Sequence, residues 1–335
     1  MKYLVYTLFF TFLLTAGIYS FVLTVDPYDV YGFNLLNYPH KAVRSARNQK
    51  FNYIDNHRDK FKTVIIGSSR AERFNPDTFG KCFGGTAYNY SVENANAEDL
   101  LTTTKHLLET QHPKTIIMFV DFYMFNGYIG YDRRFMRSPL ISYLKETPKQ
   151  LTVAHNFTLP YWHASYLSTR GLFDALRLTL KKFNNEKYTP TYLANGQHII
   201  EEAVNKPQLA KAYFSHQYKD FRPDEERMEM FREIKKLTDE QHIMLRVVLT
   251  PMMEMHYNKL LSDPNLAKNF HKFRKEMIQL FGQLVDFNNA DVAQFTKNEQ
   301  WYDTVHPTER LTNIMADIIC GNAPSRGKFG QILHQ

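Results

Sequence analysis

Cysteine is scarce in this chain: there are two in 335 residues, Cys82 and Cys320, and no Cys-x-x-Cys pair. The sequence also has no His-Glu-x-x-His signature and no glycine-rich phosphate-binding loop. It gives no support for a zinc protease, a thiol redox enzyme or a nucleotide-binding protein, so we expect neither a metal nor a cofactor. Separation along the chain does not show whether two thiols are close. A disulfide in an oxidising compartment and two buried free thiols are therefore equal alternatives.

The excess of basic residues is not organised for nucleic-acid binding. Lys and Arg number 41 against 34 Asp and Glu, a formal net charge of +7, without a basic helix or a nucleic-acid motif. This charge suits anionic envelope polymers or lipid head groups as partners. One basic cluster could lie along head groups, although composition favours a solvated face. It consists of Lys41, Arg44, Arg47 and Lys50.

The longest apolar run is at the N-terminus. Residues 3–25 carry no charge, and about 20 apolar residues are enough for a helix to cross a bilayer. A cleaved signal peptide is the alternative, but its apolar region is normally shorter, and no clear Ala-x-Ala site precedes Asp26. Length and the missing site favour an uncleaved transmembrane anchor.

The orientation of this anchor depends on its flanking charges and on the size of the domain after it. Lys2 and the amino terminus favour an N-terminus inside, whereas the basic cluster after the anchor opposes it. Long domains are translocated largely regardless of charge. We therefore expect a single-pass membrane protein whose C-terminal domain is periplasmic or extracellular.

After residue 61 the sequence alternates between short apolar runs and amphipathic segments. Strands are predicted at 63–66, 87–92, 115–120, 244–249 and 284–287, and helices at 96–111, 224–240, 269–281 and after Pro307. This alternation is typical of a parallel sheet covered by helices, and so predicts an α/β fold.

The alternation is interrupted in the middle of the chain. Between about 133 and 222, Tyr, His, Trp and Lys are scattered among short helical patterns such as 172–180, which we interpret as an inserted helical cap. The predicted organisation has four parts: a transmembrane anchor (1–25), a stalk (26–61), an α/β domain (62–325) that contains the insertion, and a tail (326–335).

Two short motifs carry the residue types of a serine hydrolase triad. Ser69 lies in Gly-Ser-Ser-Arg directly after the predicted strand 63–66, and Asp303 and His306 lie in Asp-Thr-Val-His-Pro. Open α/β sheets place ligand sites at the carboxyl ends of their strands. Ser69 would be the nucleophile, His306 the base and Asp303 the group that orients the imidazole. By propensity alone, a helix-capping Ser69 and a polar loop pair are equally compatible.

These motifs resemble those of the SGNH/GDSL hydrolase superfamily. Its first block, Gly-Asp-Ser-Leu after strand one, resembles residues 67–70, and its last block, Asp-x-x-His-Pro, is matched at 303–307. The resemblance covers 62–125 and 240–320. It implies a three-layer flavodoxin-like SGNH fold with a central parallel sheet and an esterase or O-acyltransferase activity.

Three further short segments resemble motifs of a membrane-anchored branch of this superfamily. They are Asp26-Pro27-Tyr28, Val285-Asp286-Phe287 and Trp301-Tyr302-Asp303. That branch is similar to accessory proteins of lipoteichoic-acid D-alanylation and alginate O-acetylation, which often work beside a membrane-bound O-acyltransferase. The resemblance therefore implies acyl esters of envelope glycans, acetyl esters foremost, as substrates, and such an acyltransferase as a partner.

The middle blocks of the superfamily are altered here. Asn94 stands where the second block has its oxyanion-hole glycine, and Val120-Asp121-Phe122 replaces a Gly-x-Asn in the third. Asn tolerates left-handed backbone, so the amides of Ser69 and Asn94 could still hold an oxyanion. Losing one such donor costs about a hundred- to a thousandfold in rate. A weak or inactive accessory protein that binds a glycan or an acyltransferase is therefore the alternative hypothesis.

Other candidate residues carry weaker signals. Arg70 could bind an anionic substrate group or pair with a carboxylate, and Asp121 could line the site. His256, after the predicted strand 244–249, could border the cleft, but a partly exposed loop position is favoured. His163, beside Trp162, could contact glycan, although core packing is the default. An α/β-hydrolase lipase fits less well, because the second glycine of the nucleophile elbow is missing.

Overall fold

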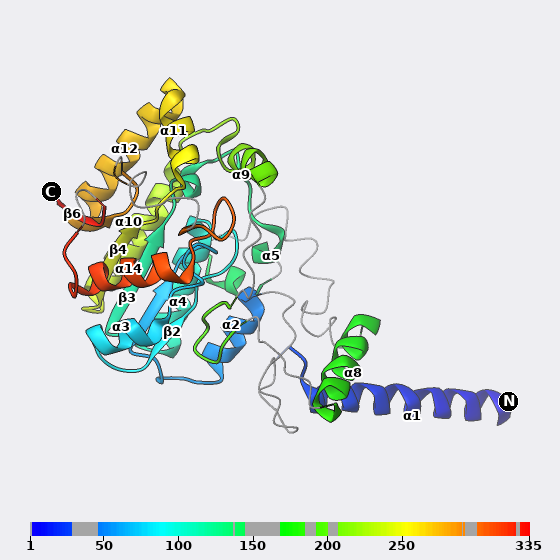
Figure 1. Cartoon of the computed structure of the whole chain (residues 1–335). Helices are drawn as coiled ribbons and strands as arrows, with labels where there is room; N and C mark the ends of the chain where they lie inside the picture. Colours follow the sequence, from blue (N-terminus) through cyan, green and yellow to red (C-terminus); the bar gives the residue numbers. More distant parts are fainter. Residues whose placement is uncertain are drawn as a thin grey trace. The chain divides into compact units, whose positions relative to one another are not determined.

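A computed structural model describes residues 2–28, 46–136, 138–144, 168–184, 192–199, 207–289, 291, 300–325 and 329–335. Four of the candidate residues, Lys41, Arg44, Trp162 and His163, lie outside these ranges. The chain forms two compact units (Figure 1). The first combines Met1–His57 with Arg133–Thr191, and the second combines Arg58–Asp132 with Tyr192–Gln335.

The first unit is helical in its described parts. Its elements are α1 (Lys2–Val25), α2 (Ala46–Asp55), α5 (Arg133–Met136), the 3-10 helix η2 (Pro139–Tyr143) and α8 (Thr169–Phe183). The helix α1 has 24 residues and is long and apolar enough to cross a membrane. The helix α2 lies in the predicted stalk. Its Arg47 and Lys50 are buried, so the two surface roles suggested for the basic cluster are wrong for these residues.

The second unit contains a six-stranded sheet. Its strands are β1 (Thr63–Ile66), β2 (Ala87–Asn89), β3 (Thr115–Val120), β4 (Met244–Leu249), β5 (Gln283–Asp286) and β6 (Gln331–His334). Their order is β2-β1-β3-β4-β5-β6. The first five are parallel, whereas β6 pairs with β5 in the antiparallel sense. The mixed α/β fold with a mostly parallel sheet is confirmed, and the predicted tail contains a strand.

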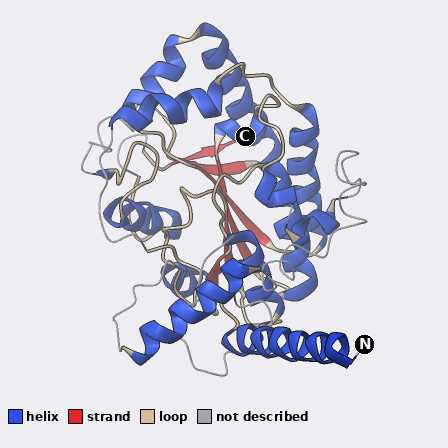
Figure 2. Ribbon diagram, turned by 90° about the vertical axis from the view of Figure 1, so that its right-hand side faces the viewer, coloured by secondary structure: helices blue, strands red, loops and turns tan. Residues whose placement is uncertain are grey.

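Helices cover both faces of this sheet (Figure 2). They are α3 (Pro76–Phe83), α4 (Ala97–Thr110), α10 (Glu225–Glu240), α12 (Pro264–Phe281) and α14 (Glu309–Cys320). The unit also contains η1 (Phe122–Phe125), α9 (Pro207–Tyr218) and α11 (Glu254–Ser262). On one face, α3 and α14 pack on β1 and β3 through a core that includes Phe79, Met315, Ile65 and Phe119. Successive side chains of a strand alternate between the two faces of the sheet. Both faces are apolar because helices cover both of them.

A disulfide between Cys82 and Cys320 joins the carboxyl ends of α3 and α14. The alternative of two free thiols is therefore wrong. The bond links residues 238 positions apart, and so fixes the helix that follows β1 to the helix that follows the Asp303–His306 loop.

Helix starts follow local capping chemistry. Asn75 accepts a hydrogen bond from the Asp77 N–H and is followed by Pro76, so α3 begins there. Thr308 caps α14 in the same way, with its hydroxyl accepting from Leu311 N–H. Pro307 therefore precedes the cap, and the helix predicted after Pro307 begins at Glu309. Pro307 itself forms an isolated β-bridge with Trp301.

Candidate active site

Ser69 lies on a tight turn at the carboxyl end of β1. The turn is closed by hydrogen bonds from Ala71 N–H to Ser68 O (2.9 Å) and from Phe74 N–H to Ala71 O (3.2 Å). Gly67 begins it, and a Cβ there would lie 2.8 Å from the Cβ atoms of both Ala71 and Phe119. Only glycine allows the chain to pass this close to β3. Ser69 itself is half-buried.

The three residues of the predicted triad meet in one place. The His306 Nε2 atom lies 2.8 Å from the Ser69 Oγ atom, although 237 positions separate the two residues. The other ring nitrogen, Nδ1, lies 2.7 Å from Asp303 Oδ2. With Nδ1–H donating to the carboxylate, Nε2 is left as the acceptor for the serine proton. This is the hydrogen-bond sequence that a nucleophilic serine needs.

The loop that carries Asp303 and His306 is held by its own backbone. Asp303 Oδ1 accepts from Val305 N–H (2.7 Å) and from His306 N–H (2.8 Å), while Tyr302 N–H donates to His306 O (2.9 Å). Burial raises the pKa of Asp303, but the hydrogen bonds from His306 and Val305 and the electrostatic attraction of the His306 ring outweigh burial and hold it at about 2. The carboxylate is therefore ionised at neutral pH and ready to orient the imidazole.

Arg70 and Asp121 form a buried ion pair beside the triad. Arg70 Nη1 donates to Asp121 Oδ1, and their side chains are 3% and 0% exposed. The same carboxylate accepts from Ser68 Oγ (2.6 Å) and from the Thr250 hydroxyl. Of the two roles suggested for Arg70, pairing with a carboxylate is the one that the structure has. Asp121 anchors the serine turn to β3 and β4, and its charge is matched by Arg70.

Arg73 is a functional candidate that the sequence did not single out. Its Nη1 donates to Pro307 O at 3.1 Å, and its guanidinium lies 4.0 Å from the centre of the Tyr302 ring. Burial lowers the pKa of Arg73 to about 10, and the negative charge of Asp303 partly opposes that shift. A single side chain from the serine turn therefore contacts residues on both sides of the Asp303–His306 pair.

The segment 192–199 packs on the outer side of the serine turn. His198 N–H donates to Glu72 O (2.8 Å), and Gln197 Nε2 donates to Arg73 O (3.1 Å). The Tyr192 hydroxyl donates to the buried Glu72 carboxylate at 2.7 Å. These residues lie in the region predicted to be an inserted cap. No periodicity marks them, and only the tertiary structure reveals that they brace the turn.

Asn94 has the left-handed backbone that its predicted role requires, with φ at +52°. Its side-chain amide donates to Asp132 Oδ2 at 3.0 Å. The next residue, Ala95, accepts a hydrogen bond from the Tyr123 hydroxyl (2.9 Å), and the Tyr123 ring lies 5.8 Å from the Arg70 guanidinium. The oxyanion role of the Ser69 and Asn94 amides stays a prediction.

His256 is buried in the first turn of α11, so the expected partly exposed loop position is wrong. Burial, together with the positive charges of Arg70 and Lys259, lowers its pKa to about 4. Its Nε2 atom has no hydrogen-bond partner within the described ranges. A pKa near 4 makes His256 a weak base at neutral pH, and its ring packs edge-on against the ring of Phe214.

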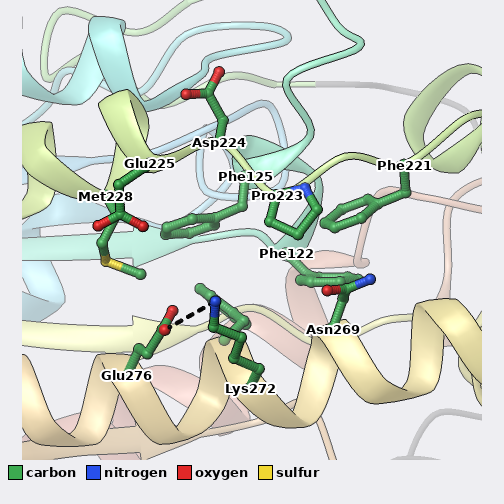
Figure 3. A pocket seen from close by; sticks show the side chains of 11 residues that line it. Phe122, Phe125, Phe221, Pro223, Asp224, Glu225, Met228, Asn269, Lys272 and Glu276 are labelled. Atoms are coloured by element: carbon green, nitrogen blue, oxygen red, sulfur yellow. Dashed lines mark ion pairs between the residues drawn. The ribbon is translucent and has the colours of Figure 1, made fainter.

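A separate small cavity lies between η1, α10 and α12 (Figure 3). Rings of Phe122, Phe125 and Phe221 face it, and an ion pair between Lys272 and Glu276 borders it. Its volume of about 30 Å³ is that of one water molecule in the liquid. The triad residues do not line it, so we do not regard it as the substrate site.

Among the residues that the structure describes, no group of three or more His, Cys, Asp or Glu side chains could hold a metal ion. No protein-family model matches the chain. No curated protein matches it significantly either.

Proposed function

We propose that the chain is a membrane-anchored serine esterase or O-acyltransferase of the SGNH type. One observation carries this proposal: the continuous hydrogen-bond sequence from Ser69 Oγ through the His306 ring to Asp303 Oδ2. A capping serine and a surface Asp-His pair, the alternatives for these motifs, would have no reason to meet across 237 residues.

The mechanism follows from the roles of these three side chains. Ser69 Oγ attacks the acyl carbonyl while His306 Nε2 takes its proton, and Asp303 stabilises the imidazolium that forms. His306 then returns the proton to the leaving alcohol, which gives an acyl-serine. Water or a glycan hydroxyl, deprotonated by His306, releases the acyl group from Ser69. The backbone amides of Ser69 and Asn94 are the proposed oxyanion donors.

The sheet supports the fold part of the proposal. Strands β1 to β5 follow the order 2-1-3-4-5, which is the order of flavodoxin-like doubly wound sheets. In such sheets ligands bind beyond the carboxyl ends of the strands, next to the point where the strand order reverses. Ser69 follows β1, which lies at this reversal between β2 and β3.

Compartment and substrate class follow from α1, the disulfide and the sequence resemblance. Disulfides persist mainly in oxidising compartments, so the Cys82–Cys320 bond favours a domain on the periplasmic or extracellular side. The length and hydropathy of α1 are those of a membrane-spanning helix, and we propose that it is an uncleaved anchor. A membrane-tethered esterase on that side meets acylated envelope glycans, and acetyl esters are the proposed substrates. A membrane-bound O-acyltransferase is the proposed partner.

Ester turnover by the purified full-length chain tests this function. We expect the wild type to hydrolyse 4-nitrophenyl acetate and Ser69→Ala to lose this activity. Ser262→Ala is the matched control, because Ser262 is an exposed serine on α11 whose hydroxyl donates to the Lys259 carbonyl of the same helix. Equal turnover by wild type and Ser69→Ala would contradict the proposal.

The altered middle blocks favour a second candidate function, a non-catalytic accessory that binds a glycan or an acyltransferase. Asn94 stands at the position of the usual glycine, and Val120-Asp121-Phe122 replaces the usual Gly-x-Asn. The Asp121 carboxylate already accepts hydrogen bonds from Arg70, Ser68 and Thr250. A deletion strain separates the two functions. Full restoration of envelope acylation by Ser69→Ala/His306→Ala would favour the accessory role, and no restoration would favour the enzyme.

A further inference from the structure

The helix α8 exposes an apolar face. Four side chains on it are large, apolar and open to the surroundings: Phe173 (67% exposed), Leu176 (40%), Leu180 (60%) and Phe183 (79%). Their spacing of three or four residues places them along one side of the helix. An exposed apolar stripe of this kind marks a surface that is covered in the working protein.

Another side of α8 packs against the end of α1. Ala175 and Leu178 are buried there in a cluster with Val22, Val25 and Tyr28. The Tyr28 hydroxyl also donates to Asp174 Oδ2 at 2.7 Å. In Figure 1, α8 crosses the carboxyl-terminal end of α1 and does not run alongside it. The apolar stripe therefore lies at the level of the last turns of α1.

A third side of α8 is charged. Arg170, Asp174, Arg177 and Lys181 follow one another at helical spacing, and Arg170 pairs with Asp174 at 3.3 Å. On a helical wheel this charged stripe lies between the side that packs on α1 and the exposed apolar stripe. The helix thus has three distinct sides, of which one faces α1, one is apolar and exposed, and one carries three cations and one anion.

We infer that α8 lies in the interfacial layer of the bilayer, beside the point where α1 leaves it. In this position the apolar stripe enters the acyl-chain boundary and the charged stripe stays at the head groups, as in other interfacial amphipathic helices. Anionic lipid strengthens the contact, because Arg170, Arg177 and Lys181 lie along the stripe that meets the head groups. The inference rests on the proposed insertion of α1.

The connection to α1 favours lipid over a protein as the occupant of this stripe. Residues that precede the α8 contact on α1 are exposed and apolar in the same way, among them Leu13 (48%) and Leu14 (67%). If lipid surrounds these side chains, then lipid also reaches the level at which α8 is fixed. A stripe of two phenylalanines and two leucines with flanking cations is typical of helices at a membrane surface.

Spin-label accessibility in vesicles tests this inference. The full-length chain carries one introduced cysteine per variant and is reconstituted in equal parts of phosphatidylcholine and phosphatidylglycerol. Both native cysteines are in the disulfide, so they do not take up the label. The test positions are Phe173→Cys, Leu180→Cys and Phe183→Cys on the apolar stripe. Arg177→Cys is the matched control on the charged stripe, and Leu13→Cys reports on α1 itself.

The expected result is a periodic pattern. Labels on the apolar stripe collide more often with oxygen, which concentrates in lipid, than with an aqueous nickel chelate, and the label at 177 shows the reverse. If labels along the whole of α8 collide with the nickel chelate while the label at residue 13 collides mainly with oxygen, the inference is overturned and the proposed anchor stands. Protection of the apolar stripe from both reagents would also overturn it, in favour of a protein partner. Aqueous values at 13 would refute the insertion of α1 and the inference with it.

Discussion

Arg73 Nη1 donates a hydrogen bond to the carbonyl oxygen of Pro307 at 3.1 Å and so joins the Ser69 turn to the His306 loop. The two residues are 234 positions apart. The same guanidinium lies over the ring of Tyr302, the neighbour of Asp303. Because the triad is built from two chain segments, its geometry depends on contacts of this kind. Arg73 is therefore a positioning residue, which acts through the loop and does not touch the reacting atoms.

Replacing Arg73 tests this role. Arg73→Met removes the hydrogen bond to Pro307 and the cation over Tyr302, and we expect ester turnover to fall about tenfold to a hundredfold through misplacement of His306. Arg73→Lys keeps a cation and one donor, so it recovers most of the rate. Turnover and thermal unfolding are measured on both variants. If Lys rescues stability but not turnover, the positioning role is wrong.

The Arg70–Asp121 pair predicts strong coupling between the two positions. Asp121→Leu leaves a guanidinium buried without its carboxylate, so the free energy of unfolding should fall by about 3 to 5 kcal/mol. Arg70→Met should lower the free energy of unfolding by a similar amount. The double variant removes both charges and should be clearly more stable than the sum of the single effects. Denaturant unfolding of the four proteins measures this coupling, and additive effects would contradict the ion pair.

His256 predicts a specific dependence of stability on pH. Its pKa is about 4 in the folded chain against an ordinary value of 6.5, so the unfolded chain binds the extra proton first. The contribution of neutral His256 is complete above pH 6.5 and is lost as pH falls towards 4. The difference between the folded and unfolded pKa values of His256 corresponds to about 3 kcal/mol of unfolding free energy. Over this range His256→Gln should lose less unfolding free energy than the wild type. Parallel curves for the two proteins would refute the buried neutral imidazole.

The disulfide predicts redox-sensitive stability. Without reductant, the denatured chain should show no thiol that reacts with a maleimide, because Cys82 and Cys320 are bonded to each other. Cys82→Ala/Cys320→Ala should lower the free energy of unfolding by about 2 to 4 kcal/mol, since α3 and α14 are no longer tied. Reduction of the wild type should reproduce this loss. Two reactive thiols in protein purified without reductant would contradict the bond.

Much of the sheet was predictable, because buried parallel strands are short apolar runs with clear boundaries. The predicted strand at 63–66 and the one at 115–120 coincide with β1 and β3. The prediction missed β6, because Gln331–His334 is an edge strand with mostly exposed side chains. It also began α12 five residues late, because the start of that helix is set by the Asp263 cap and Pro264 and not by apolar periodicity.

The site residues were predictable only where they belong to a recognisable sequence motif. The triad residues carry a recognisable chemical pattern, whereas the residues that hold them in place do not. Arg73 is an ordinary basic residue in the sequence, and its importance comes from a contact across 234 positions. From the sequence alone, a carboxylate at Asp121 would oppose an oxyanion, because the sequence does not show that Arg70 neutralises it. Such pairings arise from the order of the strands, which local patterns do not encode.

The most direct test of the account is to map the residue that a fluorophosphonate modifies. The folded wild-type chain is treated with the reagent and digested, and the phosphonylated peptide is sequenced by mass spectrometry. We predict one adduct, on Ser69, and its loss in His306→Ala, because the serine then lacks its base. Ser68→Ala separates the two adjacent serines, since the Ser68 hydroxyl is turned towards Asp121. An adduct on Ser68 or on any other serine, or none at all in the folded wild type, would contradict the account.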